Sequence, residues 1–291
     1  MEITIGKTAG FCFGVKRAVE GSLNEIKNEK EKKIYCLGEL VHNSQVIEKL
    51  KEHNIEIIED INEIKEKNAK VIIRAHGIKN EIYEIAKNKN IEIIDFTCPF
   101  VLKIHDIAKE YSEKEFYIFV IGSEKHPETQ GTVSYCGNRF SVIETEEDVQ
   151  NAMEEFNKSK LNNLLVIVQT TFSEKKFAII EEKIKKSINK NINLVIKNTI
   201  CSATNQRQKE TDELSKKVDY MIIIGGSNSS NTKKLYEVSK SNCKDTILIE
   251  TAEELDIKKI KETYKVGIMA GASTPDFSIK EVVNKLLKNK E

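Results

Sequence analysis

The sequence lacks any apolar run of the roughly 20 residues that a membrane-spanning helix needs. Its first residues, M-E-I-T-I-G-K, also lack the basic segment and the apolar stretch that make up a secretory leader. We therefore expect a protein that is neither exported nor inserted in a membrane, and that works in the cytoplasm.

A net charge is missing too, since 46 basic residues balance 46 acidic ones. Without an excess of one sign, the chain has no general field that attracts nucleic acid or an anionic membrane. We expect neither as a partner, so an anionic ligand has to be bound by local groups. The three prolines, thirteen glycines and 39% hydrophobic residues are typical of a well-folded globular protein.

Two local motifs are absent as well. No C-x-x-C pair occurs, so local spacing supports neither a ferredoxin-type cluster nor a zinc ribbon. No G-K-S/T phosphate loop occurs either, which argues against hydrolysis of nucleoside triphosphates. In a reducing compartment thiols serve as ligands, nucleophiles or core residues more often than as disulfides. Each of the six cysteines therefore needs its own argument.

Short β-branched runs alternate with amphipathic stretches rich in Lys and Glu, which is typical of α/β proteins. Several runs are apolar throughout, and this favours parallel strands that are buried on both faces of a sheet. The predicted strands lie near residues 3–5 and at 33–37, 71–75, 91–96, 116–121, 164–168, 194–197, 220–224, 246–249 and 266–270.

A weak internal repeat suggests how the chain is organised. Cys12, Cys98 and Cys201 each follow a predicted strand and open a helical pattern, about one compact α/β unit apart. We therefore predict three small pseudo-repeated α/β lobes with mainly parallel sheets around a central cleft. The predicted lobes are 14–97, 98–196 and 197–272, the last completed by 1–13 and 273–291.

Polar residues gather in the loops after the predicted strands, where parallel sheets bind their ligands. Three of the five histidines lie there, and the loop from Gly225 to Thr232 could bind phosphate through amides and hydroxyls. Each feature alone could be structural, as a hydrogen-bonding histidine or a polar turn, but together they suit a small dianionic group. The candidates are His42, His76, His126, Glu128, Thr170, Ser229, Ser230, Asn231 and Ser273.

The cysteines divide into two groups. An isolated cysteine is usually a small buried hydrophobe, which we expect of Cys36, Cys136 and Cys243. The three repeat cysteines instead stand at element junctions, where a side chain can point into a shared cleft. Three thiolates from three lobes would hold a cubane cluster with one iron that has no protein ligand. Spacing alone only suggests this arrangement.

Other residues near these motifs are not among the candidates. Lys16 and Arg17 follow Cys12 and could tune an anion or a cluster, but the favoured interpretation is that they are ordinary charges in the first turns of a helix. His105 lies on the predicted helix after Cys98, and His53 is expected in an exposed turn.

Taken together, the motifs closely resemble the 4-hydroxy-3-methylbut-2-enyl diphosphate reductase family. They occur in the family's order and span Gly10 to Pro275, so the resemblance covers nearly the whole chain. The matching motifs are G-F-C-F-G-V, L-G-E-L-V-H-N, R-A-H-G, D-F-T-C-P, H-P-E-T, Q-T-T-F-S, T-I-C-S-A-T, N-S-S-N and G-A-S-T-P.

The resemblance implies a trefoil of three lobes around a 4Fe-4S cluster bound by Cys12, Cys98 and Cys201. It also implies reductive dehydroxylation of (E)-4-hydroxy-3-methylbut-2-enyl diphosphate to isopentenyl and dimethylallyl diphosphate, in the non-mevalonate isoprenoid pathway. Electrons would come from a one-electron donor such as ferredoxin or flavodoxin. Glu128 would be the proton source with Thr170 as its hydroxyl neighbour. The implied diphosphate-binding residues are His42, His76, His126, Ser229, Ser230, Asn231 and Ser273.

Two departures from the family pattern are visible, and two other functions stay open. The glycine-serine loop lacks the lysine or similar side chain that often precedes N-S-S-N, and Ser202 stands where an aromatic residue is frequent.

One alternative function is a metal-free α/β enzyme that handles phosphate compounds with the same histidines and would be colourless. The other is a non-catalytic, cluster-containing redox sensor, which would be coloured but indifferent to allylic diphosphates.

Overall fold

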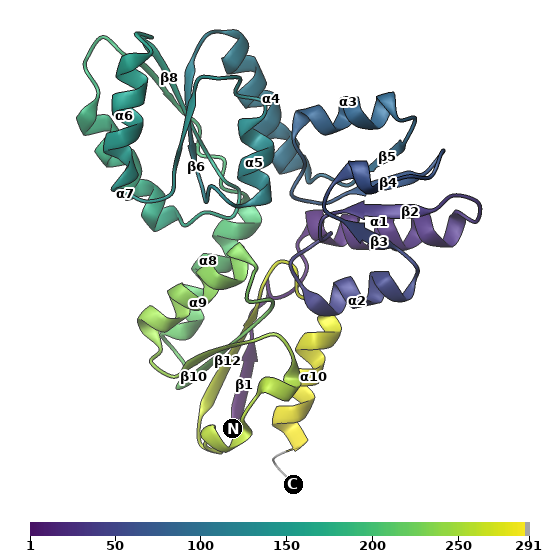
Figure 1. Ribbon diagram of the computed structural model, residues 1–291. Coiled ribbons are helices and arrows are strands. Elements are labelled where there is room, and N and C mark those ends of the chain that lie inside the picture. Colours follow the sequence, from purple (N-terminus) through teal and green to yellow (C-terminus); the bar gives the residue numbers. More distant parts are fainter. Residues whose placement is uncertain (289–291) are drawn as a thin grey trace. The chain divides into compact units, whose positions relative to one another are not determined.

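The computed structural model describes residues 1–288 of the chain (Figure 1). Within this range the strands form three four-stranded sheets, and every strand pairing is parallel. The predicted α/β class with parallel sheets is therefore confirmed. No helix of residues 1–288 is both long and apolar enough to pass through a bilayer. The last three residues of the predicted third lobe, 289–291, lie outside the described residues.

The chain divides into two compact units, which we describe separately. The first consists of residues 1–16, 41–50 and those from 202 onward, and the second of residues 17–40 and 51–201. The predicted lobe boundaries and the arrangement of the lobes around a central cleft stay predictions.

The second unit contains two sheets. The order of the first is β3-β2-β4-β5 and that of the second is β7-β6-β8-β9. The strands of the first sheet are β2 (Ile34–Leu37), β3 (Glu56–Ile58), β4 (Lys70–Ile73) and β5 (Glu92–Asp95). Those of the second are β6 (Tyr117–Ile121), β7 (Phe140–Ile143), β8 (Asn163–Val168) and β9 (Asn193–Ile196). The helices here are α3 (Asn80–Asn88), α4 (Pro99–Glu113), α5 (Pro127–Val133), α6 (Asp148–Lys158), α7 (Glu174–Ser187) and the short 3₁₀ helix η1 (Ile61–Glu63).

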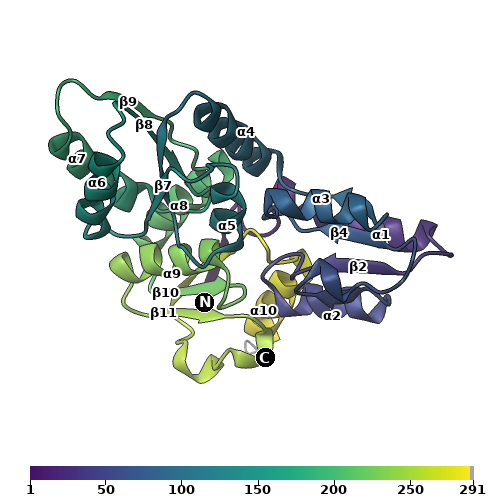
Figure 2. The same ribbon diagram turned by 45° about the horizontal axis from the view of Figure 1, so that its top comes forward.

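The first unit contains the third sheet, whose order is β1-β12-β10-β11. Figure 2 shows α9 running beside β10 and β11. The strands are β1 (Glu2–Ile5), β10 (Tyr220–Ile224), β11 (Thr246–Ile249) and β12 (Lys265–Ala270). The helices are α8 (Ser202–Ser215), α9 (Ser230–Asn242), α10 (Asp276–Lys288) and the 3₁₀ helices η2 (Ala252–Glu254) and η3 (Ile257–Lys259). Two helices, α1 (Phe13–Asn28) and α2 (Ser44–Glu52), continue from this unit into the other.

The three sheets repeat one strand order. In the first two sheets, the first strand along the chain lies between the second and the third, and the fourth lies at the far edge beside the third; the third sheet repeats this order when its strands are counted from β10. In the third sheet β1 takes the place that β5 and β9 hold in the other two. The N-terminal strand therefore completes the sheet built by the C-terminal part of the chain.

Successive side chains of a strand point to opposite faces of its sheet. A strand that is covered on both faces therefore contributes to two separate cores. In β6, Phe119 packs in one buried cluster with residues of α6 and α7, whereas its neighbours Ile118 and Val120 pack in another with residues of α4. Figure 1 shows these helices on the two sides of the sheet. Continuous burial explains why the sequence of β6 is apolar at every position. It also leaves the strand's carboxyl end, rather than its faces, for polar residues.

Candidate active site

Glu128 and Thr170 are in direct contact inside the second unit. Glu128 lies in the first turn of α5 and is only 2% exposed. Its Oε1 accepts a hydrogen bond from the backbone N–H of Thr170 at 2.6 Å, and its Oε2 accepts one from the Thr170 hydroxyl at 2.7 Å. The two residues are far apart in sequence, but β6 and β8 pair with Ile121 opposite Val168. The loops that follow these paired strand ends therefore meet.

The environment of Glu128 favours its protonated form. Burial raises the pKa of the Glu128 carboxyl more than the two hydrogen bonds from Thr170 lower it, and the net result is a pKa of about 7 instead of 4.5. A carboxyl group with this pKa holds its proton in a large fraction of molecules near neutral pH. It can therefore donate that proton to a bound molecule, as a general acid does.

Gln169 and Gly122 bring Glu128 and Thr170 together. The Oε1 atom of Gln169 accepts from the backbone N–H of Ser123 at 3.1 Å and from the Thr129 hydroxyl at 3.5 Å, so it ties β8 to the start of α5. A Cβ at Gly122 would lie 2.8 Å from Oγ1 of Thr129 and 2.9 Å from Gln169, so no larger residue fits there. Gln169 opens the Q-T-T-F-S motif but is not among the candidate residues, and none of the matching motifs includes Gly122, although both positions directly follow a predicted strand.

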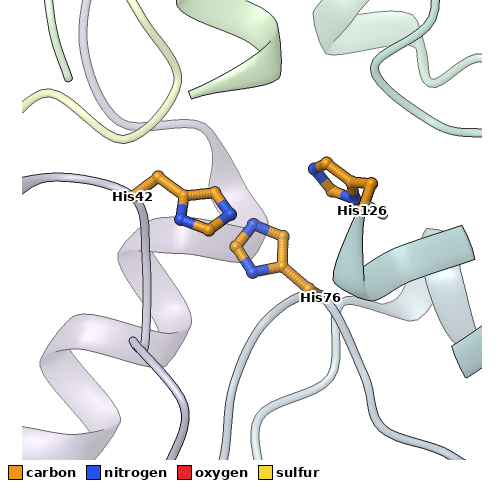
Figure 3. Close-up of side chains that lie close together, drawn as sticks. All are labelled: His42, His76 and His126. Carbon is orange, nitrogen blue, oxygen red and sulfur yellow. The ribbon is translucent and has the colours of Figure 1, made fainter. Parts of the chain in front are cut away.

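His76 and His126 also lie in the second unit, and Figure 3 shows their side chains near one another. The ring centroids are 5.4 Å apart, with the ring planes perpendicular. His76 follows β4 in a turn in which Gly77 has a φ of +76°. His126 caps α5, and its Nδ1 accepts the backbone N–H of Glu128 at 3.1 Å. The two imidazoles and the Glu128 helix thus form one polar cluster after β4 and β6.

The other candidate residues gather in the first unit. The Ser273 hydroxyl donates to the carbonyl oxygen of His42 at 3.1 Å. A Cβ at Gly226 would lie 2.7 Å from the same oxygen, so the glycine-serine loop approaches His42 as closely as glycine allows. Ser229 caps α9, where its hydroxyl accepts the backbone N–H of Thr232 at 3.3 Å. His42, Ser273 and this loop therefore form a second polar cluster.

Asn231 stands out in this second cluster because it is buried but unpaired. It is 4% exposed, and neither Oδ1 nor Nδ2 has a hydrogen-bond partner among the residues that the structure describes. Leaving a buried amide unpaired costs about 1–3 kcal/mol. In native proteins such a group calls for an explanation, and a bound water, ion or ligand that supplies the missing partner is one. Asn231 is thus suited to bind a polar group.

Cys12, Cys98 and Cys201 occupy equivalent places in the three sheets. Each is half-buried and stands directly before a helix, α1, α4 or α8. Each backbone N–H also donates to the loop after the third strand of its own sheet. The acceptors are the carbonyl oxygens of Ala272 at 3.1 Å for Cys12, Ala75 at 3.0 Å for Cys98 and Thr170 at 3.1 Å for Cys201.

The donor set of these three thiols fits an iron-sulfur cluster. Iron in such clusters is bound by cysteine sulfur, and a cluster can be held by cysteines from separate segments of a chain. The other three cysteines are buried, as expected, and burial raises the pKa of the Cys36 and Cys136 thiols to about 12. Those two are therefore neutral core residues. None of the six cysteines, all within residues 1–288, forms a disulfide.

Of the residues without an expected role, Arg17 differs from the expectation, whereas His105 lies on the helix after Cys98 as expected. Arg17 is not an ordinary helix charge, because its Nη2 donates to the carbonyl oxygen of Thr97 at 2.8 Å. His105 is buried in α4 and stacks on Tyr135, with ring centroids 4.5 Å apart. Burial lowers the pKa of His105 to about 4, so it is a neutral core residue.

Comparison with known proteins gives a consistent result. Residues 3–287 match the LytB protein family. The chain is 43% identical over 289 residues to the 4-hydroxy-3-methylbut-2-enyl diphosphate reductase of Thermoanaerobacter pseudethanolicus, covering 98% of this chain and 96% of that protein.

Two solved structures are similar over nearly the full length. The first is a structure of (E)-4-hydroxy-3-methyl-but-2-enyl diphosphate reductase, described as the terminal enzyme of the non-mevalonate pathway. It has a TM-score of 0.72 and 38% identity, with 99% of both chains covered. The second is the E-1-hydroxy-2-methyl-but-2-enyl-4-diphosphate reductase of Plasmodium falciparum. Its TM-score is 0.87 at 33% identity, covering 97% of this chain and 87% of that one.

Proposed function

Because the chain belongs to the LytB protein family, we propose that it reduces (E)-4-hydroxy-3-methylbut-2-enyl diphosphate to isopentenyl and dimethylallyl diphosphate. As a member of this family it is an oxidoreductase of isoprenoid biosynthesis. The reaction takes up two electrons and two protons, breaks the allylic C–O bond and releases the hydroxyl as water. One proton goes to the leaving oxygen and the other to an allylic carbon.

The observation that carries the proposal is the buried carboxyl of Glu128. A hydroxide ion is a poor leaving group, so C–O cleavage needs a proton donor at the oxygen. A solvent-exposed glutamic acid is almost fully ionised at neutral pH, whereas burial raises the pKa of Glu128 to about 7. Thr170 holds both carboxylate oxygens through its N–H and its hydroxyl. Glu128 is therefore the proposed general acid and Thr170 the residue that orients it.

The chain has no net positive charge that would attract an anion in general, so the substrate's diphosphate has to be bound by local hydrogen-bond donors. The two polar clusters provide imidazoles, hydroxyls and the unpaired amide of Asn231. Anchoring the diphosphate would fix the hydroxyl end of a short carbon chain relative to the proton donor. The proposed substrate-binding residues are His42, His76, His126, Thr170, Ser229, Ser230, Asn231 and Ser273.

A 4Fe-4S cluster held by Cys12, Cys98 and Cys201 would supply the two electrons one at a time and one Lewis-acidic iron. The three half-buried thiols at helix N-termini support this ligand set. Burial of Glu128 and Thr170 keeps the proton donor away from bulk water. A one-electron donor such as ferredoxin or flavodoxin is the proposed redox partner, and the cytoplasm the proposed compartment.

Spectroscopy of oxygen-free protein tests this proposal. After reconstitution with iron and sulfide, we expect a brown protein whose EPR spectrum changes when the allylic diphosphate is added, and which converts it to the two products with dithionite and a viologen dye. A colourless protein that still binds the diphosphate would favour a metal-free phosphate enzyme instead. A coloured protein that ignores the substrate would favour a redox sensor.

Asn231 allows a separate test of diphosphate binding. We expect Asn231→Leu to raise KM at least about tenfold, because one hydrogen bond to a charged group contributes roughly 1.5–3 kcal/mol. The free energy of unfolding without ligand should stay equal or increase, since a buried unpaired amide is replaced by an apolar group of similar size. Steady-state kinetics and urea unfolding measure the two effects.

The matched control for this test is Asn157→Leu on the exposed face of α6. It should change neither KM nor the unfolding free energy by a comparable amount. If Asn231→Leu destabilised the ligand-free protein strongly and left KM unchanged, Asn231 would be a structural residue and not a diphosphate ligand.

A further inference from the structure

The loop that carries Cys12 is held by α8, the helix that begins directly after Cys201. The Glu210 carboxylate accepts hydrogen bonds from the backbone N–H of Lys7 at 2.6 Å and of Thr8 at 2.8 Å, and from the Thr8 hydroxyl at 2.5 Å. These three contacts fix the start of the loop between β1 and the cysteine.

Arg207, one turn earlier on the same helix, fixes the end of the loop. It is 5% exposed, and its Nη2 donates to the carbonyl oxygen of Gly10 at 2.7 Å, two residues before Cys12. Its Nη1 donates to the carbonyl oxygen of Ala203 in the first turn of α8, at 3.1 Å. A single buried guanidinium thus joins the beginning of α8 to the Cys12 loop. Gly10 itself has a φ of +99°, a backbone conformation that glycine adopts without steric cost.

The Cys98 loop is held in the same way. Helix α1 begins directly after Cys12, and its Arg17 donates through Nη2 to the carbonyl oxygen of Thr97, at 2.8 Å. The same nitrogen lies 3.5 Å from the carbonyl oxygen of Asp95, and the guanidinium stands over the Phe96 ring at 5.9 Å. Arg17 therefore contacts each of the three residues before Cys98.

We propose that Arg207 and Arg17 are positioning residues for the cluster ligands, each holding one cysteine loop from the helix that follows another cysteine. The inference rests on the proposed function, because it assumes that these thiols bind a cluster. Arg207 is buried, and a buried charge is costly unless it is well hydrogen-bonded, so an arginine there that only joined two segments would be an expensive choice. Each guanidinium contacts the backbone one or two residues before a cysteine, and a positive charge in such a loop would stabilise the more negative, reduced state of a cluster.

Arg207→Gln and Arg17→Gln test the proposal, with Arg139→Gln as the matched control. Arg139 also donates through Nη2 to a backbone carbonyl, that of Ser112 at 2.8 Å, but no cysteine follows that carbonyl closely. We expect the two test variants to lose iron to a chelator about tenfold faster than the wild type. Mutating residues that orient metal ligands typically weakens metal binding by about that factor or more. Their cluster midpoint potentials should become more negative. The control should match the wild type in both measurements.

Three outcomes separate a positioning role from a purely structural one. Arg207→Lys keeps the charge and one donor, and it should restore most of the potential and part of the iron retention. If it restores neither, or if Arg139→Gln loses iron equally fast, the proposal is wrong. Unchanged iron loss and potential in both test variants would also overturn it.

Failure of the proposed function can be told apart from failure of this inference. If the wild type held no cluster, the proposed function would fail by itself. The loops would then be tested in the metal-free protein by mass spectrometry of thiol alkylation. Arg207→Gln should speed the alkylation of Cys12 but not of Cys98, and Arg17→Gln should do the reverse. Equal rates in wild type and variants would contradict the positioning role.

Discussion

Glu128→Gln should lower turnover by at least about a hundredfold, the usual contribution of a general acid. Glutamine keeps the size of the side chain and can still pair with Thr170, but it has no proton to donate at the leaving oxygen. Iron content, the absorption spectrum and the affinity for the diphosphate should therefore stay close to those of the wild type. Single-turnover kinetics of the reduced protein measure the loss without interference from product release.

The pH profile gives the same prediction in another form. Because the acid form is active, the contribution of Glu128 should be complete below its pKa and fall tenfold per pH unit above it. With the pKa of Glu128 at about 7, kcat/KM should decline from about neutral pH upward. For an exposed glutamic acid, whose pKa is 4.5, the decline would begin near pH 4.5. At pH 7.5 about a quarter of the Glu128 carboxyls would carry the proton, against about 0.1% for an exposed one.

Glu124→Gln is the control for both measurements, since Glu124 is exposed in the loop directly before α5, the helix that carries Glu128. It should leave turnover and the pH profile unchanged. Glu128 would lose its assigned role if its glutamine variant turned over normally, or if that variant kept the decline of kcat/KM above pH 7.

The apolar strands show what the sequence predicts well. At β6 and β10 every residue is buried, so the runs at 116–121 and 220–224 were recognisable without any knowledge of neighbours. β3 and β7 were missed, and both are short edge strands with one fully buried residue each. An edge strand has one paired neighbour and little burial, so its sequence carries a weaker hydrophobic signal.

The candidate site shows a similar division. Motifs after the strands identified Glu128 and Thr170, because parallel strands end at one edge of a sheet. Their contact became visible only with the register of β6 and β8, which brings the two loops together. The role of Gln169 could not be inferred, because a long polar side chain near a strand end has many possible partners. Arg207 is a similar case, since nothing in its helix sequence points to the carbonyl oxygen of Gly10.

Serine substitutions at the six cysteines should separate them into two groups of three. We expect Cys12→Ser, Cys98→Ser and Cys201→Ser each to lower bound iron severely and to reduce turnover at least about a hundredfold, because a serine hydroxyl is a poor substitute for a thiolate ligand of iron. Iron and sulfide analysis after anaerobic reconstitution, together with EPR, measures the loss. Turnover is then measured on the same preparations.

The other three substitutions are well-matched controls because each new hydroxyl has an acceptor in place. The Sγ atoms of the buried cysteines already face backbone carbonyl oxygens: Gly38 at 3.2 Å from Cys36, Thr132 at 3.5 Å from Cys136 and Asp219 at 3.5 Å from Cys243. Serine there should cost some stability but leave iron content and turnover near the wild-type values. Equal loss of iron in all six variants would mean that the metal responds to general destabilisation. In that case the three repeat cysteines could no longer be assigned as its ligands.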